Sequence, residues 1–132
     1  MASTYKEVWI EAPSDAIWDA ARDIGALHTR LVPGFVVDTK LEPGARIVTF
    51  ANGMTIREPI ITVDDQRRRL VWGAVGGATT HYNAVLQVIA EANGTRVLWT
   101  SDFTPDALEP QISAMQDQGL AAMKRAFERA SK

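Results

Sequence analysis

The sequence predicts an α+β fold in which a curved antiparallel sheet of seven strands wraps around one long C-terminal helix. Three observations predict it. One β-rich segment precedes a short helix, six more follow with only turn-like breaks between them, and the end of the chain has helical periodicity. The 132 residues suffice for a core without disulfide or metal support. We expect a single domain spanning 1–132.

The first elements are a strand and a short amphipathic helix. Residues 5–11 are rich in β-formers and stop at Ala12-Pro13. Ser14 is a suitable N-cap for the helix that follows, and Gly25 would end that helix. We expect one further helical turn at 26–31. The apolar residues on the buried face of the helix would be Ile17, Ala21 and Ile24, with Trp18 beside them.

The central part of the chain is a β region with very short breaks. Turn-forming pairs such as Pro43-Gly44, Asn52-Gly53 and Gly76-Gly77 separate the strands. Breaks this short join antiparallel neighbours, because parallel strands need crossovers of about a dozen residues or more. The expected arrangement is therefore a meander. Its six strands are predicted at 35–41, 46–51, 55–63, 69–75, 80–90 and 95–103.

The last segment, about residues 110–130, is predicted to form a single helix. Pro110 suits its first turn, where a missing N–H has no helical partner to lose. Apolar and small residues then recur at steps of three and four, which is typical of an amphipathic helix. The residues of this stripe are Ile112, Met115, Gly119, Met123 and Phe127.

These elements together predict a cavity. Seven strands about 4.8 Å apart form a sheet more than about 30 Å wide, whereas a helix is only about 10–12 Å across. The sheet must therefore curl around the helix, and space is expected to remain at one end. The small residues Gly119 and Ala122 and the flexible Met115 and Met123 favour an adaptable apolar cavity. The alternative is that bulky strand side chains fill the space completely.

The composition argues against several classes of protein. A net charge of −2 does not fit a nucleic-acid-binding surface, so no nucleic-acid partner is expected. Arg67, Arg68 and Arg69 follow two aspartates and are interpreted as a solvated hairpin rather than a phosphate site. No apolar stretch is long enough to span a membrane. The first residues lack a charged-then-apolar leader, so a cytoplasmic location is expected.

No metal or other cofactor is expected either. The chain has no cysteine, and its two histidines, His28 and His81, have no second ligand at helical spacing. Gly76-Gly77 is not followed by a helix or a Walker lysine, so it does not form a nucleotide-binding loop. The sequence leaves the oligomeric state open, a homodimer included.

Several stretches resemble the START-like helix-grip (SRPBCC) superfamily, and within it the polyketide cyclase/dehydrase-like family. They are YKEVWIEAPSDAIWDAARDIGAL, TIREPIITVDDQRRRLVW, HYNAVLQV and TRVLWTSDFTPD. The similarity covers nearly the whole chain, although relatives often carry a tryptophan before the proline of ALHTRLVPG. The resemblance implies a helix-grip fold that binds lipids, sterols, polyketides or other hydrophobic metabolites, with catalysis in only some members.

Strand alternation sorts the candidate ligand contacts by face. It places Trp72, Tyr82 and Trp99 on inward faces, whereas His81 shares its parity with polar residues and is expected to face solvent. The alternative is that the aromatic residues are simply core. The full set of candidate contacts is Trp72, Tyr82, Trp99, Phe103, Met115, Gly119, Met123 and His81.

Glu58 is the candidate catalytic residue. It shares strand parity with Ile56, Ile60 and Thr62, so an inward-facing apolar stripe would carry its carboxylate into the cavity. Desolvation there would raise its pKa and suit it to act as a general base or a hydrogen-bonding anchor. The alternative register puts Ile61 and Val63 inside and leaves Glu58 exposed.

Three functions fit these expectations. The first is binding or transport of a small hydrophobic metabolite in the cavity. The second is a cyclase/dehydratase-type enzyme, in which Glu58, helped by Tyr82 or His81, would move protons during aldol closure and loss of water. The third is a protein-interaction module whose groove meets a partner. The first function is preferred because the sequence contains no convergent catalytic set.

Overall fold

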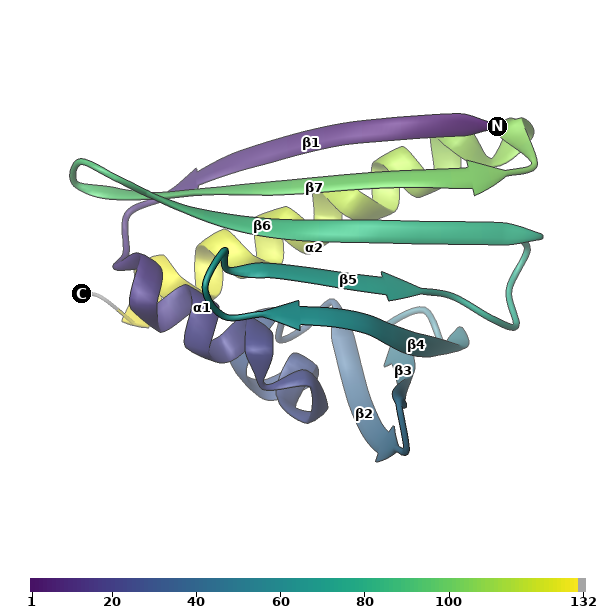
Figure 1. Cartoon of the computed structure of the whole chain (residues 1–132), viewed down its shortest axis with the longest axis horizontal. Coiled ribbons are helices and arrows are strands. Elements are labelled where there is room, and N and C mark those ends of the chain that lie inside the picture. Colours follow the sequence, from purple (N-terminus) through teal and green to yellow (C-terminus); the bar gives the residue numbers. More distant parts are fainter. Residues whose placement is uncertain (131–132) are drawn as a thin grey trace.

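The computed structural model describes residues 1–130 and has the predicted order of elements (Figure 1). Seven antiparallel strands form one sheet in the order β1-β7-β6-β5-β4-β3-β2. The strands are β1 (Ala2–Ile10), β2 (Val36–Glu42), β3 (Ala45–Phe50), β4 (Thr55–Asp64), β5 (Arg69–Gly73), β6 (His81–Glu91) and β7 (Gly94–Thr104). The helices are α1 (Ser14–Arg22), η1 (Ile24–Ala26), η2 (Leu27–Leu31), η3 (Asp106–Leu108) and α2 (Glu109–Ala130).

The sheet is curved rather than flat. In Figure 1, β2 and β3 run steeply across the direction of β5, β6 and β7, so the two ends of the sheet do not share a plane. Register shifts lie between Val36 and Asp38 on β2 and between Ile60 and Thr62 on β4. Such bulges increase the local bend of a strand. The curvature turns one face of the sheet toward α2.

The helix α2 lies along this inner face (Figure 1). Its buried side chains include Ile112 and Met123 of the predicted stripe. Gln116, which the sequence pattern placed on another face, is buried as well. Gly119 lets the helix approach the sheet closely, because a Cβ added there would lie 2.8 Å from Trp99 Cζ3. The space beside this glycine is therefore filled by an indole ring.

The segment after β1 differs from its prediction in two details. Ser14 lies within α1, Pro13 occupies the N-cap position without a side-chain cap, and the Ser14 hydroxyl instead accepts a hydrogen bond from Arg68. The helix ends at Arg22 rather than at Gly25. Gly25 lies in η1, where a Cβ would be 2.9 Å from the Leu41 side chain, so this glycine permits a close contact rather than capping the helix.

The arginine run forms the β4–β5 hairpin, as predicted. Arg67 pairs with Asp64, and Arg68 pairs with Asp15 at the start of α1. Arg68 therefore ties the hairpin to α1 through a surface ion pair. Among residues 1–130, no helix is both long enough and apolar enough to cross a membrane.

Candidate functional site

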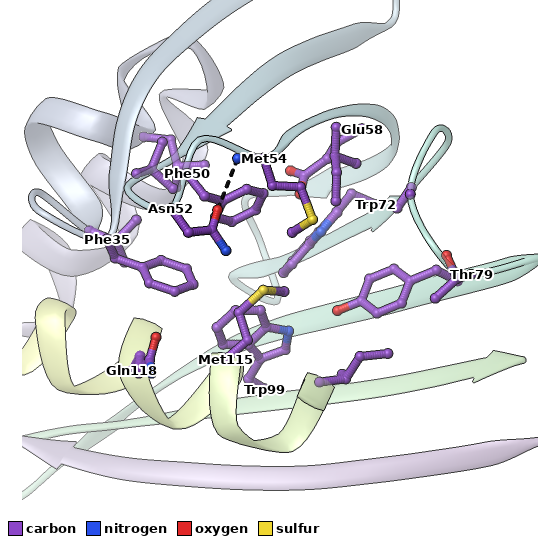
Figure 2. A pocket seen from close by; sticks show the side chains of 18 of the residues that line it. Phe35, Phe50, Asn52, Met54, Glu58, Trp72, Thr79, Trp99, Met115 and Gln118 are labelled. Atoms are coloured by element: carbon purple, nitrogen blue, oxygen red, sulfur yellow. Dashed lines mark hydrogen bonds between the residues drawn. The ribbon is translucent and has the colours of Figure 1, made fainter. Parts of the chain in front are cut away.

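A cavity of about 470 Å³ lies between α2 and the inner face of the sheet. Figure 2 shows side chains from both sides surrounding it. Its wall is largely apolar and comes from η2, from α2 and from strands β2 to β7. The aliphatic and aromatic lining residues are Leu27, Leu31, Val32, Phe35, Val36, Phe50, Met54, Ile56, Leu70, Trp72, Ala74, Ala78, Tyr82, Leu86, Trp99, Leu108, Ile112, Ala114, Met115 and Met123.

Two pairs of aromatic rings shape the wall. Trp72 on β5 and Trp99 on β7 pack with their centroids 5.9 Å apart and their planes tilted by 50°. Phe35 and Phe50 meet edge to face at 5.4 Å. Rings packed in this way present large, rigid apolar surfaces. Figure 2 shows these four rings around the space that Met115 faces from α2.

Arg46 and Glu58 form a buried ion pair in this wall. They lie opposite each other on β3 and β4, and Arg46 Nε donates to Glu58 Oε1 at 2.9 Å. Only 3% of the Arg46 side chain and 10% of the Glu58 side chain are exposed. Burial raises the pKa of the Glu58 carboxyl above its ordinary value, and the Arg46 charge and hydrogen bond partly oppose that rise. The wall therefore carries two charges that largely compensate each other.

Arg46 is held by more than its carboxylate partner. Its Nη1 donates to the carbonyl oxygen of Ile24 at 3.3 Å. Its guanidinium carbon also lies 5.7 Å from the centroid of the Trp72 ring, within the range of a cation–π contact. These contacts fix the guanidinium between η1, β4 and β5, and they orient the Glu58 carboxylate beside the cavity.

Tyr82 brings a second polar group to the wall. Burial raises the pKa of Tyr82 to about 12, and the charge of Glu58 acts in the same direction. The phenol therefore keeps its proton at physiological pH and can donate a hydrogen bond. Gln116, Ser101 and Trp99 lie close enough to the phenol to oppose part of that rise in pKa.

A buried polar cluster lies behind Tyr82, between α2 and the β1–β7 pair. Gln116 Nε2 donates to Ser101 Oγ at 2.9 Å, and the Ser101 and Thr4 hydroxyls share a hydrogen bond of 2.5 Å. Within residues 1–130, Trp99 Nε1 and Gln116 Oε1 are buried without a hydrogen-bond partner of good geometry. The cluster gives this end of the core a polar character that the sequence pattern did not predict.

The structure brings most of the predicted site residues together. Glu58 is buried beside the cavity, so the inward register is the correct one, and Ile61 of the alternative register is 56% exposed. The bulge after Ile60 ends the inward stripe before Thr62, which is exposed. The predicted contacts that line the cavity are Trp72, Tyr82, Trp99, Met115 and Met123.

Three predicted contacts lie elsewhere. Phe103 is fully buried in the core, where its ring stacks against Tyr82 with centroids 6.4 Å apart. Gly119 faces Trp99 rather than open space. His81 is exposed at the start of β6, as its parity with polar residues predicted. We therefore do not propose these three as ligand contacts.

Sequence reasoning missed Arg46, although a signal for it was present. The turn around Asn52-Gly53 fixes the register of β3 against β4, and that register pairs Arg46 with Glu58. Directly opposed residues on an antiparallel pair point to the same face. An inward Glu58 therefore implies an inward Arg46.

A curved antiparallel sheet that grips a C-terminal helix and encloses an apolar cavity defines a helix-grip fold of the ligand-binding type. The chain belongs to the family described as polyketide cyclase / dehydrase and lipid transport, whose sequence model matches residues 1–128. No curated protein matches the sequence.

Solved structures share the whole fold. An uncharacterised protein from Bacillus thuringiensis has a TM-score of 0.86 at 23% identity, covering 96% of this chain and 98% of that chain. The protein XoxI from Bacillus cereus has a TM-score of 0.88 at 22% identity, covering 100% and 99%. The di-domain ARO/CYC protein BexL, from the BE-7585A biosynthetic pathway, has a TM-score of 0.82 at 14% identity, covering 97% of this chain and 47% of BexL. At these identities the similarity shows the fold alone.

Proposed function

We propose that the protein binds a small, largely apolar molecule in the cavity beneath α2, as a carrier or a sensor. The observation that carries this proposal is the cavity itself. Its volume of about 470 Å³ falls within the range of small-molecule sites, about 300–1,000 Å³, and such sites have mostly apolar walls with a few placed polar groups. Burial of ligand surface against this wall would supply the driving force for binding.

A pair of variants on α2 tests the proposal. Met115→Trp places a bulky indole ring in the cavity wall, whereas Ala121→Trp adds the same ring at an exposed position of the helix. Native mass spectrometry of protein isolated from its own source should detect a retained small molecule in the wild type and in the Ala121 variant. The Met115 variant should retain much less. Equal retention by both variants would show that the molecule binds outside the cavity.

A catalytic role is the second candidate, and the position of Glu58 favours it. A buried carboxylate with a raised pKa is a stronger base than an exposed one. Glu58 would remove a proton from a carbon between two carbonyl groups, and the electron pair of that C–H bond would move onto a carbonyl oxygen. The Tyr82 phenol would then donate a hydrogen bond to the enolate oxygen. The aldol closure of a poly-β-ketone begins with this step.

The enzyme candidate predicts turnover. The protein should consume a poly-β-ketone substrate, and Glu58→Gln should abolish that activity while circular dichroism shows an intact fold. Glu42→Gln is the matched control, because Glu42 also pairs with an arginine, Arg57, but at the surface. Equal turnover by wild type and Glu58→Gln would exclude Glu58 as the base, and no turnover at all would leave the binding function as the better account.

A further inference from the structure

We propose that the cavity selects a neutral molecule carrying a hydroxyl group, which donates a hydrogen bond to Glu58, and that it rejects fatty acids and other anionic lipids. This inference rests on the proposed binding function and adds the chemical class of the ligand. It follows from how the charged groups of the cavity wall are already paired.

The first step is the charge of the wall. Among the described residues that line the cavity, the charged ones are Arg46 and Glu58, and they pair with each other at 2.9 Å. The wall is therefore close to neutral. A ligand carboxylate would bring in a third charge without a partner, and a buried, unpaired charge is strongly unfavourable.

The second step is that the charge of Arg46 is already compensated. Its Nε binds Glu58, its Nη1 binds the Ile24 carbonyl, and the Trp72 ring lies against the guanidinium. A fatty acid that used Arg46 as its anchor would share it with the Glu58 carboxylate. Two carboxylates would then face one guanidinium.

The third step is that Glu58 can accept a further hydrogen bond. An ionised carboxylate offers about four acceptor positions on its two oxygens, and Arg46 Nε takes one of them on Oε1. Glu58 also lines the cavity, so a hydroxyl group within the cavity can donate to it. Hydrogen bonds to an ionised acceptor are stronger than those between neutral groups.

The rim of the cavity, formed by its exposed lining residues, is uncharged as well. The exposed polar residues that line the cavity are Asn52, Gln111 and Gln118, and all three carry uncharged amides. Figure 2 shows Asn52 and Gln118 at the cavity, on the β3–β4 turn and on α2. In the part of the chain that the structure describes, the cavity rim therefore offers no cation to attract an anionic head group. A neutral molecule needs no such cation.

Two ligands with the same chain and different head groups test the proposal. Dodecanol and dodecanoate should displace the neutral fluorescent probe N-phenylnaphthylamine from the wild-type protein with different affinities. Dodecanol should bind at least about tenfold more tightly than dodecanoate at about pH 8, where the free acid is fully ionised. This ranking needs no variant.

Charge variants separate the role of Glu58 from the general cost of burying a carboxylate. Glu58→Gln leaves Arg46 as an unpaired cation, so dodecanoate should gain about tenfold or more and dodecanol should not. Glu42→Gln removes the same charge from the exposed pair with Arg57 and should leave the wild-type ranking unchanged. Adding Arg46→Gln to Glu58→Gln removes both charges and should restore the preference for the alcohol.

The outcomes distinguish this inference from the function on which it rests. If the probe does not bind and no dodecyl compound is taken up, the proposed binding function fails, and this inference fails with it. If the wild type binds dodecanoate as tightly as dodecanol, the cavity binds ligands but the proposed selectivity is wrong. If Glu58→Gln folds and leaves the ranking unchanged, Glu58 is not the head-group contact.

Discussion

Arg46→Met is expected to destabilise the fold strongly, because it leaves the Glu58 carboxylate buried without its counter-charge. At the observed separation of 2.9 Å, Coulomb's law with an effective dielectric constant of about 20 gives an attraction of about 6 kcal/mol. The variant no longer buries a guanidinium, which recovers part of that loss. The free energy of unfolding should therefore fall by about 3–5 kcal/mol at neutral pH.

The same variant should show a characteristic pH dependence. Burial raises the pKa of Glu58 above its ordinary value of 4.5, and Arg46 opposes that rise. Without Arg46 the pKa rises further. Below the unfolded-state pKa such a carboxyl group is protonated in both states, and its burial then costs no ionisation energy. As the pH rises towards the raised folded-state pKa, the free energy of unfolding falls. The loss caused by Arg46→Met should therefore be small at about pH 4 and grow towards about pH 8.

Urea unfolding, followed by the fluorescence of the four tryptophans, measures this loss at both pH values. Combining Arg46→Met with Glu58→Leu removes both charges and should recover most of the stability. Arg57→Met breaks the exposed pair with Glu42 and should change stability little. The reasoning is refuted if the Arg46 variant loses the same stability at both pH values, or no more than the Arg57 variant.

Three further changes test the packing and the buried polar groups. Gly119→Ala should lower the free energy of unfolding by about 1–3 kcal/mol in a urea titration, although alanine favours helix, because the new Cβ would lie 2.8 Å from Trp99 Cζ3. Thr95→Val removes a buried 2.7 Å hydrogen bond to the Ala12 carbonyl and should lower it by about 1–3 kcal/mol, visible in thermal unfolding. Burial raises the pKa of Tyr82 to about 12, so Tyr82→Phe should abolish an ultraviolet phenolate transition expected near that pH in the wild type; an unchanged transition would contradict the placement of this phenol.

The strands were predictable wherever one face is buried along their whole length. Buried residues alternate with more exposed ones from Ala84 to Val88 on β6 and from Thr95 to Phe103 on β7, and the two strands pair without a register shift from His81↔Thr104 to Glu91↔Gly94. A period of two over so many residues defines both the strand and its inward face. This alternation placed Trp99 and Tyr82 on the correct face.

Alternation failed where the backbone departs from a regular strand. On β4, Thr62 was expected to continue the inward stripe, but the register shift after Ile60 inserts an extra residue and reverses the faces. A bulge of this kind has no distinct residue pattern in this sequence. The end of α1 was misplaced for a related reason. Gly25 was interpreted as a helix stop, yet it is required by the contact with Leu41, and a tertiary contact cannot be predicted from local sequence.

The origin of the cavity also differs from the expected one in part. Small residues on the inner face of α2 were expected to create the space, but the Trp99 ring fills the volume beside Gly119. The lining of the cavity also includes Gly77 and Ala78 from the β5–β6 loop and Ala114 from α2, and all three are exposed. Small residues therefore keep the rim open, whereas aromatic rings form the wall. The width of the sheet relative to one helix explains why a space exists, and the rim residues explain why it is not closed. Larger side chains at Gly77 or Ala78 would therefore restrict entry of a ligand before they disturb the core.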